Sequence, residues 1–178
     1  MSSPTYTIRR PRINDKDQWR PLWHDYIKFY QSQLSDEVTD LLWQRIHDEQ
    51  HSINCFVAEE VSTSELIGFA HYISHPSTWN AKLYCYMEDL FVSPTLRGGG
   101  GGTALIKAVS DEAAKKNWSD VYWHTQASNT QARGLYDKIT GGADGFICYR
   151  IEPQELPPES KVQRFNFHDL YLTLSINS

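Results

Sequence analysis

Apolar and polar residues alternate along several short segments of the chain, and this period of two is typical of β-strands. Residues 6–10 show the alternation, and residues 53–60, 66–74 and 83–92 form three further runs with strand character. The segment Val-Ser-Thr-Ser at 61–64 has the composition of a turn between the runs 53–60 and 66–74. Four strands are therefore predicted in the first half of the chain.

Elsewhere the apolar residues recur at helical spacing. After Asn14, a predicted N-cap, the apolar stripe consists of Trp19, Leu22, Trp23, Tyr26, Ile27 and Tyr30. The other predicted elements are helices over 36–50, 103–116 and 129–139 and strands over 121–124 and 146–151. This order predicts an α/β (α+β) fold in which a mixed, mostly antiparallel sheet is flanked by helices on both faces.

Length and charge limit the architecture and the partners. With 178 residues, of which 40% are hydrophobic, the chain can bury one core, and we expect one domain over residues 1–151. From residue 152 a Pro-containing linker begins, and residues 165–174 are apolar enough for a final strand. The net charge of −5 suits a cationic amine as partner better than nucleic acid.

The chain also lacks the signals of export and membrane insertion. Its N-terminus has no basic-then-apolar pattern, and no apolar run approaches the roughly 18 residues that span a bilayer. The three cysteines, Cys55, Cys85 and Cys148, are odd in number and widely spaced, so a disulfide framework is not expected. We expect a protein of the cytoplasm, or of cytoplasm and nucleus, without a membrane partner.

The most informative local feature is a run of five glycines, residues 98–102, which follows Arg97 and leads into the helix predicted from Thr103. Glycine lets the backbone approach a ligand closely and adopt positive φ, so successive N–H groups can converge on anionic oxygens. The helix N-terminus and Arg97 add positive charge. A site for the phosphate groups of a cofactor is therefore predicted here.

Two well-known glycine patterns fit this run poorly. A P-loop is excluded because Thr103 and Ala104 stand where it needs Lys and then Ser or Thr. The dinucleotide fingerprint G-x-G-x-x-G/A is matched by Gly99, Gly101 and Ala104, but its glycines should begin directly after a strand, and residues 93–96 intervene. An NAD-binding redox module is therefore only an alternative.

A third pattern, Arg/Gln-x-x-Gly-x-Gly/Ala after a strand and a short loop, is matched by Arg97, Gly100 and Gly102. With it, residues 86–106 (YMEDLFVSPTLRGGGGGTALI) resemble the acetyl-CoA-binding motif of the GNAT superfamily of N-acetyltransferases. Residues 129–138 (NTQARGLYDK) resemble the helix that follows in that superfamily. Two motifs in the right order are much more specific than either alone, and the resemblance covers roughly residues 6–151.

Within the superfamily two branches are similar to this chain. Pro76, Trp79 and the pair Glu88-Asp89 look like the spermidine/spermine and thialysine acetyltransferases. The aromatic residues of the first helix look like fungal histone and D-amino-acid acetyltransferases. This second likeness implies a homodimer in which residues 165–174 are an arm exchanged between subunits, whereas the simpler alternative is a strand folded back on its own sheet.

The resemblance implies acetyl-CoA as cofactor and assigns a set of residues to it. The backbone of 90–92 corresponds to the strand that pairs with pantetheine, and the glycine loop to the phosphate site. The implied contacts are Leu90, Phe91, Val92, Arg97, Gly98, Gly99, Gly100, Gly101, Gly102, Thr103, Asn129, Ala132, Tyr136 and Lys138. Gly99 and Gly101 replace bulkier residues of the family pattern, which raises the entropic cost of ordering the loop by about 0.5–1 kcal/mol each. Asn129 is also expected to cap its own helix.

Acetyl transfer to an amine needs a base, because alkylamines have a pKa of about 10.4 and are charged at neutral pH. Glu88 is the predicted base, since simple alternation along 83–92 places it on the face of Tyr86 and Leu90, with Asp89 on the other face. The resemblance gives Tyr136 the role of donating a proton to the departing thiolate.

The acceptor is expected to be held by two carboxylates and two aromatic rings, namely Glu88, Asp89, Trp79 and Tyr30. Trp19 and Trp23 either add to these walls or belong to the core. The predicted function is acetyl transfer to a primary amine of a small amine, amino acid or polyamine by direct attack in a ternary complex. Acetylation of a basic protein tail or histone lysine, and a non-catalytic acyl-CoA-binding module, are the alternatives.

Two further patterns are expected to be structural. His47 and His51 stand at i, i+4 as zinc ligands do, but Asp48 replaces the glutamate that zincins use as base, so no metal site is predicted. Cys85 is expected to be buried in its strand rather than to carry an acetyl group.

Overall fold

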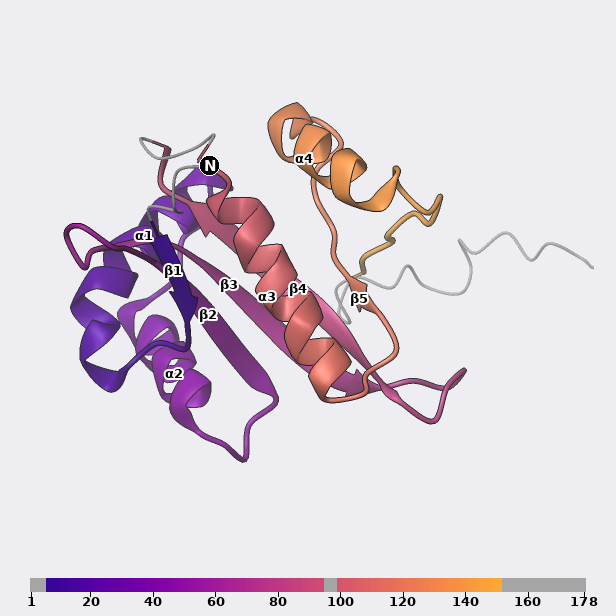
Figure 1. Ribbon diagram of the computed structural model, residues 1–178, viewed down its shortest axis with the longest axis horizontal. Helices are drawn as coiled ribbons and strands as arrows, with labels where there is room; N and C mark the ends of the chain where they lie inside the picture. The colour runs from indigo at the N-terminus through magenta and orange to yellow at the C-terminus, as the bar shows by residue number, and fades with distance from the viewer. Residues whose placement is uncertain (1–5, 95–98, 152–178) are drawn as a thin grey trace, which may run out of the picture. The chain divides into compact units, whose positions relative to one another are not determined.

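In the computed structural model, which describes residues 6–94 and 99–151, helices cover both faces of a β-sheet (Figure 1). The described strands lie in the order β1 (Tyr6–Arg9), β2 (Ile53–Glu60), β3 (Leu66–Pro76), β4 (Leu83–Val92) and β5 (Val121–Tyr122). Neighbours are antiparallel except β4 and β5, which are parallel. The predicted α/β fold with a mixed, mostly antiparallel sheet is thus confirmed.

The described helices are the short 3-10 turn η1 (Ile13–Asp15) and α1 (Lys16–Phe29), α2 (Asp36–His47), α3 (Gly101–Lys115) and α4 (Thr130–Thr140). The described residues up to Ala143 belong to one compact unit, and the described residues 144–151 belong to another. All the elements above belong to the first unit. Among the described residues, no helix is both long and apolar enough to cross a bilayer.

Two apolar clusters hold the helices to the sheet. On one face, α1 and α2 bury Trp19, Trp23 and Trp43 against Phe69 and Phe91 of the sheet. The position of Trp19 and Trp23 in this cluster makes them core residues rather than walls of an acceptor site. On the other face, α3 packs its side chains among those of the sheet in a second cluster that contains Ala58, Ala70, Tyr72, Met87, Leu105, Ile106 and Val109.

The predicted cap at Asn14 is wrong, because Asn14 lies inside η1 and α1 begins after Asp15. The Asp15 carboxylate is buried, and it accepts hydrogen bonds from Arg9 Nη1 at 2.5 Å and from the Arg12 N–H at 2.7 Å. Burial raises the pKa of Asp15, but these hydrogen bonds outweigh burial and hold the pKa below its ordinary value. The ion pair of Asp15 with Arg9, together with its bond to Arg12, therefore sets the start of the first helix.

A predicted strand at the end of the described chain is also wrong. Residues 146–151 have no regular secondary structure, and no described strand pairs with them. Alternation within six residues favours a strand only where a neighbouring strand pairs with it, and a local pattern does not supply that neighbour. The linker and the apolar segment 165–174 lie outside the described residues.

The strand β4 contains a bulge at Glu88. Asp89 lies opposite His71 and Met87 lies opposite Tyr72, so Glu88 is an extra residue in the ladder. Met87 and Leu90 both belong to the α3 face, which puts Tyr86 and Leu90 on opposite faces of the sheet. The expectation that Glu88 shares one face with both is therefore wrong, because one inserted residue reverses the phase of the alternation.

Candidate functional site

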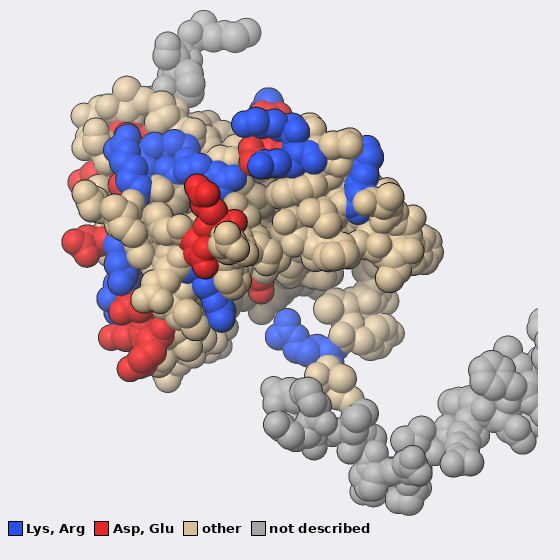
Figure 2. All heavy atoms as spheres, turned by 90° about the horizontal axis from the view of Figure 1, so that it is seen from below, with Lys and Arg blue, Asp and Glu red and all other residues tan. Residues whose placement is uncertain are grey.

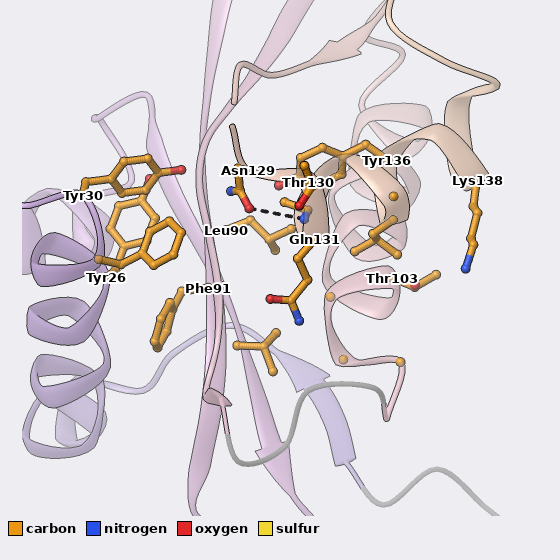
Figure 3. Close-up of a pocket in the computed structure, with 18 residues that line it drawn as sticks. Tyr26, Tyr30, Leu90, Phe91, Thr103, Asn129, Thr130, Gln131, Tyr136 and Lys138 are labelled. Carbon is orange, nitrogen blue, oxygen red and sulfur yellow. Dashed lines mark hydrogen bonds between the residues drawn. The ribbon is translucent and has the colours of Figure 1, made fainter. Parts of the chain in front are cut away.

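A cavity of about 620 Å³ lies where β4 ends, between α1 on one side and α3 and α4 on the other (Figure 3). Its walls combine aromatic side chains, glycine backbone and the polar groups of a helix N-terminus. The lining residues are Tyr26, Phe29, Tyr30, Leu90, Phe91, Val92, Gly100, Gly101, Gly102, Thr103, Asn129, Thr130, Gln131, Ala132, Gly134, Leu135, Tyr136 and Lys138.

The cavity exists because β5 is short. It pairs with β4 only at Cys85–Val121 and Tyr86–Tyr122, and the chain then leaves the sheet and forms α4. The last residues of β4, 90–92, line the cavity together with α4. A parallel pair of strands that separates in this way opens a cleft at the carboxyl end of the sheet, which is a common place for a ligand.

The glycine loop forms the floor of the cavity at the N-terminus of α3. Gly100 precedes the helix with a φ of +84°, in the left-handed region that favours glycine. The first N–H groups of a helix have no intrahelical acceptor, and Gly101, Gly102 and Thr103, which begin α3, all line the cavity. A Cβ at Gly102 would lie 3.1 Å from Leu135 Cδ2, so α3 and α4 approach closely here. This N-terminus can receive anionic oxygens.

Three residues assigned to the cofactor are not part of these walls. Arg97 and Gly98 lie outside the described residues. Gly99 is described and exposed, but it does not line the cavity. The other eleven predicted cofactor contacts do line the cavity.

The helix α4 contributes a capped N-terminus and a tyrosine. Asn129 caps the helix by accepting a hydrogen bond from the Ala132 N–H at 3.3 Å, as predicted. Tyr136 packs its ring against Trp123 with centroids 5.3 Å apart. Burial, and to a smaller extent Tyr30, raises the pKa of Tyr136 to about 12. The Tyr136 hydroxyl therefore carries its proton at neutral pH and can donate it. Lys138 lines the cavity from the last turn of α4.

The opposite wall is aromatic and comes from α1. Tyr30 was expected at the acceptor, and it lines the cavity with its ring centroid 5.0 Å from that of Tyr26. Tyr26 and Phe29 were not assigned to a site. The sequence placed Tyr26 in the core stripe of its helix. Its i, i+4 spacing from Tyr30 could have indicated that both tyrosines lie on the same side of the helix and line the cavity together. Burial, and next the charge of Asp89, raises the pKa of Tyr26 well above its ordinary range.

The two carboxylates of β4 have different surroundings. Glu88, at the bulge, is exposed and stands two residues before Leu90 of the cavity wall. Partial desolvation, and next the charge of Asp89, raises the pKa of Glu88. The Asp89 side chain is only 14% exposed, and its Oδ2 lies 2.9 Å from His71 Nδ1. Neither carboxylate lines the cavity itself, although both are adjacent to it in the strand.

Three other candidates lie away from the cavity. Trp79 is 93% exposed in the turn that joins β3 to β4, at the far end of β4. Cys85 is fully buried, and burial raises its pKa to about 12, so it is not a thiolate nucleophile at neutral pH. His47 ends α2 with its Nδ1 2.9 Å from the Trp43 carbonyl oxygen, and His51 lies beyond the helix. The described part of the chain contains no group of three or more His, Cys, Asp or Glu residues placed to hold a metal ion.

Charges are mixed on the surface. On the face drawn in Figure 2, both Lys and Arg side chains and Asp and Glu side chains are present among the described residues. Among the charged side chains of the described residues, Arg20 pairs with Asp36 at 2.6 Å and Lys107 pairs with Asp111 at 2.6 Å.

Comparison with known proteins gives one family. The model of the acetyltransferase (GNAT) family matches residues 19–141. The D-amino-acid N-acetyltransferase HPA3 of Saccharomyces cerevisiae is 32% identical over 150 residues, which are 84% of this chain and 93% of that protein. The thialysine N-epsilon-acetyltransferase of Mus musculus is 32% identical over 119 residues, 61% of this chain and 69% of that protein.

Solved structures show the same fold at lower identity. A probable acetyltransferase aligns with a TM-score of 0.73 at 19% identity and covers 86% of this chain and 99% of that one. An aminoglycoside acetyltransferase from an uncultured soil metagenomic sample, in complex with sisomicin, aligns with a TM-score of 0.69 at 16% identity and covers 83% and 96%. At these identities the likeness concerns the fold alone.

Proposed function

Because the chain belongs to the GNAT family and is an acetyl-CoA-dependent N-acetyltransferase, we propose that it acetylates the primary amine of a small molecule by direct attack in a ternary complex. The observation that carries the proposal is the composition of one cavity. It combines the helix N-terminus at Gly100–Thr103, the end of β4 and the protonated hydroxyl of Tyr136.

The residues present fit acetyl-CoA. The first turn of α3 offers N–H groups and a positive dipole end to phosphate oxygens, and its glycines leave room for their approach. Leu90–Val92 give the cavity an apolar side, and Asn129, Thr130 and Gln131 at the N-terminus of α4 give it a polar side. When bound, acetyl-CoA supplies the thioester carbonyl that an amine attacks and the thiolate that leaves.

The chain's own groups then handle two protons. Glu88 takes a proton from the ammonium group of the acceptor, directly or through a water molecule, and its raised pKa brings it closer to the basicity that this task requires. Tyr136 donates its proton to the leaving sulfur, because its pKa of about 12 keeps it protonated at neutral pH. Tyr26 and Tyr30 form the opposite wall of the cavity.

The acceptor class rests on the relatives and on charge. The names of two relatives specify D-amino acids and thialysine, which are small molecules with primary amines. The chain's net charge of −5 and the carboxylates of β4 favour a cationic acceptor. A basic protein tail is the second candidate acceptor, and the test below includes it.

We expect release of free CoA thiol from acetyl-CoA with at least one small amine. The measurement is thiol release with D- and L-amino acids, thialysine, polyamines, glucosamine and histone peptides at equal concentration. Turnover with histone peptides alone would contradict the small-molecule assignment. CoA binding without transfer to any amine would contradict catalysis by this chain.

The Tyr136→Phe enzyme should lose about 10²-fold or more of kcat with little change in the Kd for CoA, because only the donated proton is removed. Measured thiol release and calorimetric CoA binding test this. Tyr84→Phe is the matched control, since Tyr84 lies on β4 outside the cavity and contacts His75. Equal kcat values for the Tyr136 and Tyr84 variants would remove Tyr136 from the mechanism.

A further inference from the structure

Asp89 takes part in a buried polar chain that runs from the core to the cavity. The Trp19 indole Nε1–H donates to His71 Nε2 at 3.2 Å, and His71 Nδ1 lies 2.9 Å from Asp89 Oδ2. An indole nitrogen can only donate, so His71 Nε2 must accept and the imidazole must carry its proton on Nδ1. His71 is 2% exposed, and this proton points to the Asp89 carboxylate. The orientation of the imidazole and of Asp89 is therefore fixed from the core side.

The same contact marks the place of the bulge. His71 and Asp89 are cross-strand partners, and on the next rung the register has moved by one residue, so that Tyr72 faces Met87 and Glu88 is left over. A bulge re-aims the side chains next to it, and its position depends on the contacts of the neighbouring rungs. The His71–Asp89 contact therefore stabilises the residue pair next to the bulge, and with it the position of Glu88.

On its other side Asp89 faces α1. The Asp89 charge acts on the hydroxyl of Tyr26, which lines the cavity and packs edge-on against Tyr30. The charge of one carboxylate thus acts on both Glu88, the predicted base, and Tyr26 of the aromatic wall. Since the Asp89 side chain is 14% exposed and one of its oxygens is committed to His71, little of it can reach an acceptor.

We propose that Asp89 is a positioning residue, anchored by His71 and Trp19, which fixes Glu88 at the bulge and Tyr26 at the cavity and does not itself bind the acceptor amine. This rests on the proposed acetyl transfer and replaces the sequence-based assignment of Asp89 to substrate binding. Asp89 acts on these two neighbours because it forms the rung next to Glu88 in β4 and its charge faces the Tyr26 hydroxyl.

The test compares Asp89→Asn with Asp89→Ala. Asn keeps an oxygen that accepts from His71 Nδ1–H, whereas Ala keeps none. If Asp89 positions Glu88, the Asn variant retains kcat within a few-fold, and the Ala variant loses about 10- to 100-fold of kcat. The acceptor KM stays within about twofold in both, because no bond to the substrate is removed. If Asp89 instead binds the ammonium group, both variants raise the acceptor KM by tenfold or more, and that result would overturn the proposal.

A pH profile separates positioning from simple loss of stability. The charged and titratable groups near Glu88 are Asp89 and His71 of β3. Those near Asp89 also include Tyr26 of α1 and Cys55 of β2. The Asp89 charge raises the pKa of Glu88, so in Asp89→Asn the acidic limb of kcat/KM should move to lower pH. An unmoved limb would contradict the coupling of Asp89 to Glu88.

A spectroscopic measurement keeps the proposal testable apart from turnover. The His71 Nδ1–H proton should give a downfield NMR signal in the unmodified protein and in Asp89→Asn, and this signal should be lost in Asp89→Ala. A signal that persists in Asp89→Ala would show that Asp89 does not anchor His71. If the unmodified chain releases no CoA thiol with any amine, the proposed function fails, while the NMR comparison still decides the anchoring.

Discussion

The Glu88→Gln enzyme is expected to lose about 10²- to 10⁴-fold of its kcat near neutral pH, while its Kd for CoA stays unchanged. Gln has nearly the shape of Glu but cannot accept a proton from an ammonium group, so only the acid–base step is removed. Glu88 stands at the β4 bulge beside the cavity but does not line it, which is why cofactor binding should be spared.

The pH dependence of kcat/KM gives a second test of Glu88 as the base. Glu88 acts as a base only when it is ionised, so kcat/KM should rise as the pH increases through the pKa of Glu88. Partial desolvation and Asp89 raise that pKa above its ordinary value of 4.5, and the acidic limb should therefore lie above pH 4.5. In Glu88→Gln this limb should be absent. Glu65→Gln is the matched control, since Glu65 is an exposed residue just before β3. A limb retained in Glu88→Gln would assign the base to another residue.

The regular elements were predictable because their signals are local. The bounds of β2 and β4 agree with the predicted runs 53–60 and 83–92, and α2 begins at the predicted Asp36. The glycine run likewise indicated a loop that ends in a helix N-terminus, and α3 begins at Gly101. Alternation, helical spacing and glycine chemistry are properties of neighbouring residues, and they need no knowledge of the rest of the chain.

Several failures depend on side-chain contacts and strand pairing that the periodic pattern does not show. The bulge at Glu88 depends on the pairing of β4 with β3, which alternation within one strand cannot reveal. The start of α1 depends on the ion pair of Asp15 with Arg9 rather than on capping by Asn14. Asp89 faces His71, 18 residues before it in the chain, so its buried role was equally invisible. Tertiary contacts thus decide the parts of the site that local patterns leave open.

The Gly100→Val protein is expected to bind CoA about 10- to 100-fold more weakly than the unmodified protein, which corresponds to a strain of about 1–3 kcal/mol. Gly100 has a φ of +84°, which β-branched residues rarely adopt. A Cβ there would also lie 2.9 Å from the Tyr6 hydroxyl oxygen. Relief of this strain requires movement of the N-terminus of α3, whose N–H groups line the cavity.

The matched pair Gly100→Ala and Gly101→Ala isolates the backbone effect, because each adds one methyl group to adjacent positions. Gly101 does not have positive φ, and a Cβ there would meet only the Val92 methyl groups at an ordinary 3.7 Å. Calorimetric CoA binding should therefore weaken in Gly100→Ala and change little in Gly101→Ala, with thermal melting to check that both fold. Equal losses in the two variants would mean that the left-handed residue of the loop is not Gly100 in the CoA-bound protein, and the phosphate register built on Arg97, Gly100 and Gly102 would then be wrong.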